Sequence, residues 1–245
     1  MLGLGNSLVS SSSMPFHPSD ISGLVANFNS SVGITLSSTY VTRWADTTGS
    51  YLLVPEDTDF RPQWSDSRGL IFTGDEDVAI ADRLELKDAA GGDPASITLD
   101  TSSSGFCIIV QYASDDWDDG KYILGNHGAS EAHSLNHRAS SNSFDFTIRD
   151  TTKNFALNAP ASLTDADHYS IVFNSDNGGV TELFINNTKQ TDTETFGNID
   201  FVMNQVGATD NDNALTGNVK NIILYDKELS TAELAQIETY LKVFR

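Results

Sequence analysis

The closing segment of the chain, residues 217–245, constrains the fold more than any other part of the sequence. It begins with an apolar run at residues 219–225 that is short and rich in β-branched and aromatic side chains. Such a run favours a strand in the middle of a sheet over a helix. The polar residues 226–228 end this strand, and a helical pattern follows at once.

Residues 230–244 carry the signals of a helix. Ser230 fits the N-cap position, and Glu233 completes a capping box with it. Leu229 before the cap and Leu234 after it are placed for a hydrophobic staple. The apolar residues that recur at helical spacing are Leu234, Ile237, Leu241 and Phe244. We therefore predict one C-terminal helix, the only helix that the sequence indicates.

Short apolar runs separated by turn residues fill the middle of the chain. We predict strands at residues 106–112, 121–124, 143–148, 168–174 and 180–185. Asn186 and Asn187 predict a tight turn that accepts positive φ. The single cysteine, Cys107, lies inside the run FCIIV and is expected to be a buried core residue.

Three motifs occur in a fixed order along residues 20–245. The opening motif is carried by Gly23, Leu24, Val25, Phe28, Trp44, Asp46, Thr48 and Gly49. The second comprises Arg61-Pro62 and the segment 69–77. The closing motif is carried by Gly217, Tyr225, Asp226, Leu229, Ser230, Tyr240 and Leu241. In this order the motifs resemble the laminin-G-like domains of the concanavalin A-like lectin/glucanase superfamily, although Asn221 stands where that family often has Glu.

The resemblance implies an all-β fold, a concanavalin A-like jelly-roll β-sandwich of two antiparallel sheets with one C-terminal helix. We expect this domain to span residues 20–245. Residues 1–19 are expected to form an N-terminal arm or linker, because a serine run at residues 10–13 is typical of a flexible connection. The start LGLGNS before such a domain also resembles structural proteins of marine tailed phages.

The charge of the chain is strongly one-sided. Fourteen Lys and Arg residues against 34 Asp and Glu residues give a net charge of −20. Binding to nucleic acid needs a basic face, so this composition argues against nucleic-acid partners and against anionic membrane surfaces. No apolar run reaches the roughly 18 residues that membrane insertion requires. Mutual repulsion that keeps the protein soluble is the favoured interpretation; adaptation to salt or several divalent-cation sites is the alternative.

Two acidic loops are candidate binding sites. The first surrounds Trp117 with Asp115, Asp116, Asp118 and Asp119. The acidic composition favours a solvated hairpin loop with Trp117 folded back onto the sandwich. The alternatives are Ca²⁺ coordination by the carboxylate oxygens, or a sugar stacked on the Trp117 indole. The second loop, residues 209–213, offers Asp210 and Asp212 as metal ligands but lacks the Gly and distal Glu of an EF-hand. Ca²⁺ is therefore the one cofactor for which the sequence offers candidate ligands.

His127, His133 and His137 raise the question of a metal site. On one strand, His133 and His137 would share a face but lie about 13 Å apart, at ~3.3 Å per residue. That separation is too large for one ion, so we interpret all three as ordinary polar strand and loop residues.

The resemblance also gives a test for catalysis, because the glucanase branch carries Glu-x-Asp-x-x-Glu on one strand. This spacing is absent here, and so are the nucleophile elbow and the phosphate-binding glycine loop. We therefore expect a non-enzymatic interaction module at a virion surface or outside a cell: a phage head-decoration, fibre or tail-associated protein. Its arm would bind other virion proteins in a homo-oligomer or larger assembly. The alternative is a carbohydrate-binding, lectin-like domain for host-surface or polysaccharide attachment, with or without calcium; a divergent glycoside hydrolase ranks third.

Overall fold

A computed structural model describes residues 16–74, 81–102, 104–115, 121–126, 132–138, 143–157, 163, 167–197, 200–208 and 214–244. Its helical elements are η1 (Pro18–Asp20), η2 (Thr58–Phe60), α1 (Thr231–Leu241) and η3 (Lys242–Phe244). Its first nine strands are β1 (Leu24–Asn29), β2 (Ile34–Ser37), β3 (Tyr40–Ala45), β4 (Tyr51–Val54), β5 (Gln63–Ser65), β6 (Gly69–Thr73), β7 (Leu84–Asp88), β8 (Ile97–Asp100) and β9 (Phe106–Ser114). The others are β10 (Lys121–Asn126), β11 (His133–Arg138), β12 (Ser143–Ile148), β13 (Thr151–Ala156), β14 (Tyr169–Ser175), β15 (Val180–Ile185), β16 (Thr188–Thr195), β17 (Asp200–Met203), β18 (Gln205–Val206) and β19 (Thr216–Tyr225).

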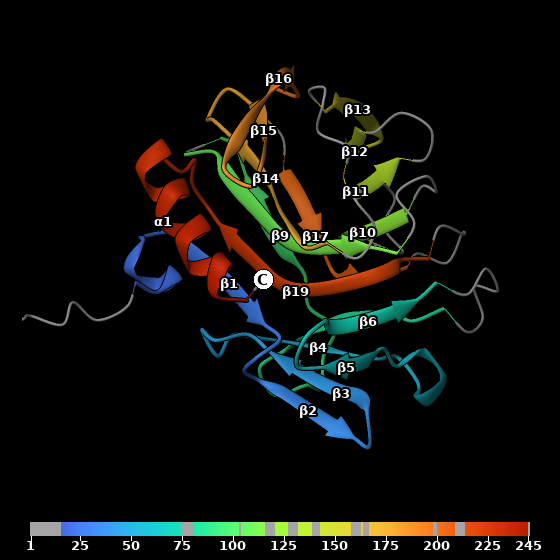
Figure 1. The fold of residues 1–245 in the computed structure, drawn as a ribbon. Coiled ribbons are helices and arrows are strands. Elements are labelled where there is room, and N and C mark those ends of the chain that lie inside the picture. The colour runs from blue at the N-terminus through green and yellow to red at the C-terminus, as the bar shows by residue number, and fades with distance from the viewer. Residues whose placement is uncertain are drawn as a thin grey trace, which may run out of the picture.

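Seventeen of the described strands form two antiparallel series that make a β-sandwich, and β8 and β17 pair with each other in a separate two-stranded sheet (Figure 1). One series runs β16–β15–β14–β9–β19, and the far edge of β19 pairs with β1 along one half and with β6 along the other. The second series runs β2–β3–β4–β7–β18–β10–β11–β12–β13. A single pair, Tyr40 with Gln63, joins β3 of the second series to β5 beside β6. The predicted all-β, antiparallel architecture is confirmed.

Alternation along the central strands divides the interior into two layers. In β9, Ile108 and Val110 point into the large core between the sheets, and Cys107 and Ile109 point to the opposite face. That opposite face is covered by α1, whose Leu234, Ile237 and Leu241 join the second cluster. The molecule therefore has three layers: a sheet, a second sheet, and one helix.

Aromatic rings fill the space between the sheets. Phe146 of β12 lies 4.9 Å from Phe173 of β14 and 5.1 Å from Phe201 of β17, measured between ring centroids. All three side chains are fully buried. Because each ring buries a large apolar area and comes from a different strand, this cluster holds the two sheets together.

The start of the C-terminal helix folds as its sequence predicts, whereas α1 ends at Leu241 and the predicted face residue Phe244 lies in η3, outside the cluster beneath the helix. The Ser230 hydroxyl accepts a hydrogen bond from the Glu233 backbone N–H, and the Glu233 carboxylate accepts one from the Ser230 backbone N–H at 2.8 Å. Leu229 and Leu234 are both buried in the cluster beneath α1. One finding was not expected: Glu238, on the same helix, is 5% exposed and accepts a hydrogen bond from Ser170 of β14.

The start of the described chain packs against this ending. Phe16 contacts the cluster beneath α1, and the His17 ring lies edge-on to Tyr240 of the helix at 5.9 Å. Residues 16–19 of the predicted arm are therefore described, and Pro18 begins η1. Residues 1–15 lie outside the described part of the chain, so the role of the arm stays a prediction.

Candidate functional site

Most of the predicted binding residues lie outside the described part of the chain. These are Asp116, Trp117, Asp118, Asp119, Asp210 and Asp212, together with His127. Asp115 is described, at the end of β9, and its carboxylate forms a 2.6 Å ion pair with Arg68. The calcium hypothesis therefore stays a prediction, and the one described ligand candidate is already engaged with a cation.

His133 and His137 lie on the same face of β11, as the strand spacing predicts. Both are almost fully buried, at 4% and 2% exposure, and each packs against a different phenylalanine. His133 lies 6.1 Å from Phe201, and His137 lies 5.9 Å from Phe144, between ring centroids. Within the described ranges, no three His, Cys, Asp or Glu side chains are grouped so as to hold a metal ion.

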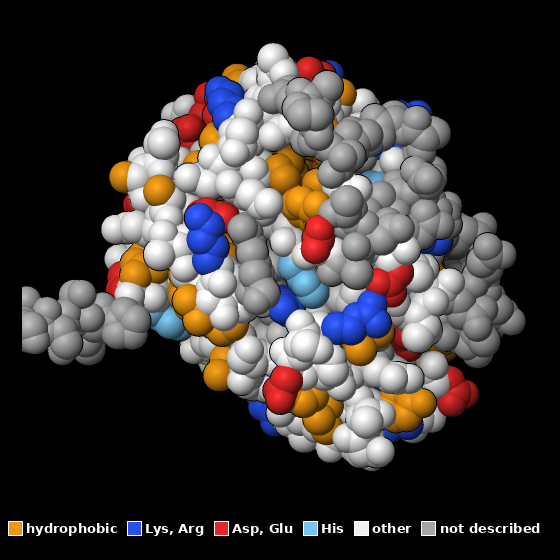
Figure 2. All heavy atoms as spheres, in the orientation of Figure 1, with side chains coloured by type: hydrophobic (Ala, Val, Ile, Leu, Met, Phe, Trp, Pro, Cys, Tyr) orange, Lys and Arg blue, Asp and Glu red, His pale blue; other side chains and the backbone are white. Residues whose placement is uncertain are grey.

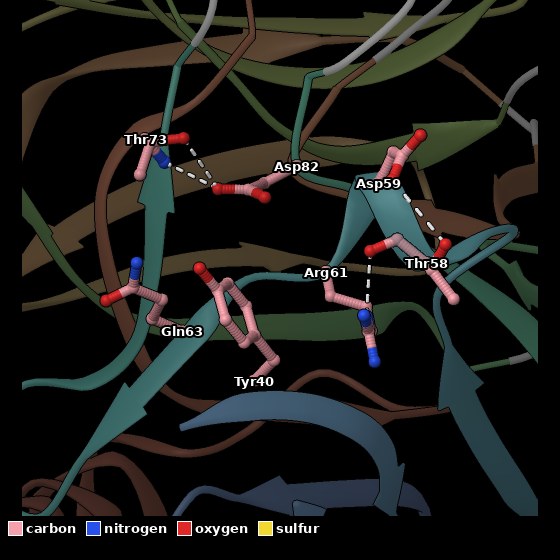
Figure 3. Close-up of a pocket in the computed structure, with 7 residues that line it drawn as sticks. All are labelled: Tyr40, Thr58, Asp59, Arg61, Gln63, Thr73 and Asp82. Atoms are coloured by element: carbon pink, nitrogen blue, oxygen red, sulfur yellow. Dashed lines mark hydrogen bonds between the residues drawn. The ribbon is translucent and has the colours of Figure 1, made fainter. Parts of the chain in front are cut away.

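A polar pocket of about 440 Å³ opens where β3, β5 and η2 meet, and we call it the Tyr40 pocket (Figure 3). Its lining consists of Tyr40, Thr58, Asp59, Arg61, Gln63, Thr73 and Asp82. The register of β3 and β5 places Tyr40 directly opposite Gln63. Backbone hydrogen bonds on either side of that pair, from Val41 N–H to the Pro62 carbonyl and from Trp64 N–H to the Thr39 carbonyl, are both 2.9 Å long and fix it.

Arg61 is held in place from two directions. Its Nε donates a 2.8 Å hydrogen bond to the Thr58 carbonyl, across η2. Its guanidinium carbon lies 5.6 Å from the centre of the Tyr40 ring, a cation–π distance. The planar guanidinium therefore covers one side of the tyrosine, and its terminal N–H groups have no acceptor among the described residues.

Asp82 forms the buried wall of the pocket. It is 6% exposed, and its Oδ2 accepts hydrogen bonds from the Thr73 backbone N–H at 2.8 Å and from the Thr73 hydroxyl at 2.9 Å. Figure 3 shows the Tyr40 side chain between Gln63 and Arg61, with its hydroxyl directed toward the side of the pocket that Thr73 and Asp82 line. The floor and walls are thus positioned before any ligand arrives.

The chemistry of the Tyr40 pocket suits a neutral molecule with many hydroxyl groups. Arg61 supplies donors, the Asp59 carboxylate supplies acceptors, and the Gln63 amide supplies both. The lining contains two carboxylates, those of Asp59 and Asp82, and one guanidinium, that of Arg61, and this charge balance disfavours an anionic ligand. Tyr40 is 41% exposed, so it presents a flat apolar surface beside these polar groups.

Sequence reasoning missed this pocket. Arg61 and Gln63 flank a proline in a segment noted only for its match to a family motif, and Tyr40 stands in a run without other signals. The one usable signal is an aromatic residue placed on the exposed face of a hairpin strand among polar neighbours.

No model of a known protein family matches the sequence, and no curated protein sequence matches it either. In the described part of the chain, no helix is long and apolar enough to cross a membrane.

Several solved structures are similar in fold. The sialidase of Trypanosoma rangeli in complex with 2,3-difluorosialic acid superimposes with a TM-score of 0.58 at 11% identity, over 91% of this chain and 34% of that chain. The binding domain of botulinum neurotoxin DC in complex with rat synaptotagmin II gives a TM-score of 0.58 at 11% identity, over 89% of this chain and 52% of that one.

This chain thus spans about a third of the sialidase and about half of the neurotoxin chain. At such low identity the likeness shows the β-sandwich fold alone. The finer assignment to laminin-G-like domains, and the likeness to phage proteins, stay predictions.

Proposed function

We propose that this protein is a non-enzymatic, lectin-like binding module whose Tyr40 pocket holds a neutral sugar. The observation that carries the proposal is the arrangement of Tyr40, Arg61 and Gln63. An exposed ring, a guanidinium fixed over it and an amide opposite it converge on one pocket. Small-ligand sites are concave, largely preformed and supplied with a few convergent polar groups.

Each group has a role in this proposal. The Tyr40 ring contacts the apolar face of the sugar, because a pyranose presents C–H groups on one side. Arg61 and Asp59 bind neighbouring hydroxyl groups, one as donor and the other as acceptor. Gln63 sets the orientation of the sugar, since its amide offers an acceptor oxygen and a donor nitrogen at two fixed positions.

The fold neighbours give supporting analogy. A T. rangeli sialidase is described in complex with sialic acid, and a neurotoxin binding domain in complex with synaptotagmin II. A sugar and a protein are thus both bound by proteins that contain a part of similar fold, which is about a third of the sialidase chain and about half of the neurotoxin chain. The composition of the Tyr40 pocket favours the sugar for this chain. A virion structural role and arm-dependent assembly stay predictions, because no described contact favours them.

A glycan array with fluorescently labelled protein tests the proposal. Wild type is expected to bind a defined set of neutral glycans, and Tyr40→Ala is expected to lose at least tenfold in affinity, because ring contact and the position of Arg61 are lost together. Leu36→Ala is the matched control: it removes another exposed apolar side chain, 38% exposed, from the same β2–β3 hairpin.

Trp117→Ala separates the Tyr40 pocket from the predicted acidic loop. Binding that survives Trp117→Ala but not Tyr40→Ala supports the proposal. Binding lost only in Trp117→Ala moves the site to the loop, and no binding to any glycan by folded wild type refutes the lectin-like function.

A further inference from the structure

A second pocket, which we call the Lys220 pocket, has a different chemistry. It is about 510 Å³ in volume and is lined by Ser67, Arg68, Asp167, His168, Tyr169, Asn186 and Lys220. In the space-filling view, a histidine side chain lies between basic side chains at the centre of one face, over β19 and β6 (Figure 2). In a chain with a net charge of −20, a gathering of basic groups requires an explanation.

Lys220 owes its position to a β-bulge. Val219 pairs with Tyr112 and Asn221 pairs with Gln111, so Lys220 is the extra residue on β19. At the same point, the opposite edge of β19 changes its neighbour from β1 to β6. Bulges are known to redirect a side chain, and this one turns the lysine into the pocket wall.

The charge of Lys220 has no carboxylate partner among the described residues. Its side chain is 6% exposed, and its Nζ donates a 2.6 Å hydrogen bond to the Phe244 carbonyl. By contrast, Arg68 is neutralised by its 2.6 Å ion pair with Asp115. A buried ammonium with one neutral acceptor leaves two N–H donors and a full positive charge for a ligand.

His168 adds an acceptor beside that charge. Its Nε2 donates to the Arg68 carbonyl at 3.2 Å, which leaves Nδ1 as an acceptor when the ring is neutral. The ring is neutral at physiological pH, because burial and then the nearby Lys220 charge lower the pKa of His168 to about 4. The pocket therefore presents a cation and an acceptor for a hydroxyl group side by side.

We propose that the Lys220 pocket binds a sugar carrying a carboxylate, of the hexuronic acid class, with the carboxylate on Lys220 and a hydroxyl donating to His168 Nδ1. A cation that no described carboxylate neutralises matches a monoanion, and the exposed Asp167 carboxylate in the lining disfavours a phosphate dianion. Ser67 and Asn186 give the wall further polar groups, and Tyr169 gives it one aromatic ring. This site is separate from the Tyr40 pocket and does not depend on it.

NMR titration of ¹⁵N-labelled protein with D-glucuronate tests the site, with D-glucose and inorganic phosphate as comparison ligands. Saturable shifts of the amides of residues 68, 168 and 220 are expected with glucuronate and not with glucose. Lys220→Met is expected to weaken binding at least tenfold. Lys189→Met is the matched control, since it removes the same charge from a 50%-exposed side chain on β16 that pairs with Glu182.

Two readouts do not require the Lys220 variant to fold. In wild type, bound glucuronate should shift the ring resonances of His168 saturably, because a ligand hydroxyl donates to Nδ1; in the free protein, the charged groups that act on this ring are Lys220, Arg68 and Asp115. Binding should also persist in Tyr40→Ala, which distinguishes this site from the proposed function. The proposal is overturned if glucuronate leaves the three amides unshifted, or if phosphate binds at least as tightly.

Discussion

The Tyr225 hydroxyl donates a 2.8 Å hydrogen bond to the Pro18 carbonyl, joining residues 207 positions apart in the chain. Tyr225 ends β19, the strand with partners on both sides, and Pro18 begins η1. The ring is fully buried between the sheet and the segment that precedes β1. This bond fastens the first described residues to the strand that leads into α1, so both ends of the domain close at one place.

Replacing Tyr225 with Phe should destabilise the protein by about 1 kcal/mol, because it removes this bond and little volume. The loss should stay small, since the Pro18 carbonyl still accepts from the Ile21 N–H at 3.2 Å. Thermal unfolding should show a melting point lower by roughly 2–4 °C. Tyr40→Phe, which removes an exposed hydroxyl, should leave the melting point unchanged; equal shifts in the two variants would contradict the role given to Tyr225.

Replacing Ser230 with Ala should cost about 1 kcal/mol of stability, because the N-cap hydroxyl is lost. It accepts from the Glu233 backbone N–H at 3.3 Å and donates to the Glu233 carboxylate at 2.8 Å. Thr239→Ala serves as the control, since its hydroxyl bonds to the Ala235 carbonyl on the exposed side of the same helix. Urea unfolding measures the loss of stability in both variants. A larger loss for Thr239→Ala than for Ser230→Ala would contradict the role given to the capping box.

Replacing Phe146 with Ala should cost about 3–5 kcal/mol, because it leaves a cavity at the centre of the sandwich. The ring contacts others from several strands, including Phe196 at 5.5 Å and Phe106 at 6.2 Å. The comparison is Phe244→Ala: this partly exposed ring packs on Tyr240 at 5.0 Å and should cost less than about 1.5 kcal/mol. Similar losses in both variants, measured by urea unfolding, would mean that the sheets are held together in another way.

The sequence predicted those elements whose signals are local. The strands at residues 143–148 and 180–185 have the bounds expected from their apolar patterns, and the capping box starts α1 where the sequence places it. Asn186 and Asn187 adopt the expected positive φ angles, 50° and 62°. In each case the information lies within a few neighbouring residues.

Elements that depend on a partner strand, and not on a pattern in their own residues, were not predicted. β13 and β16 are polar strands with several exposed residues, and they form because β12 and β15 offer edges to pair with. The Tyr40 pocket depends in the same way on one pairing between β3 and β5, and the Lys220 pocket depends on a bulge between β19 and β9. Spacing along the sequence carries no trace of either arrangement.

The stability of the protein should fall in mild acid partly because of His168. Burial keeps this ring neutral in the folded state, with a pKa of about 4, whereas in the unfolded chain it titrates near 6.5. The unfolded state therefore binds the extra proton between these values, and the stability from this residue is present above about pH 6.5 and is lost as the pH falls toward 4. Wild type should lose on the order of 1–3 kcal/mol more than His168→Gln between pH 7.5 and pH 5.0. The Gln side chain keeps a donor for the Arg68 carbonyl, and the titration of the carboxylates common to both proteins cancels in the comparison. Urea unfolding of both proteins at the two pH values measures this difference; if the gap between them does not change with pH, His168 is not held neutral by its burial.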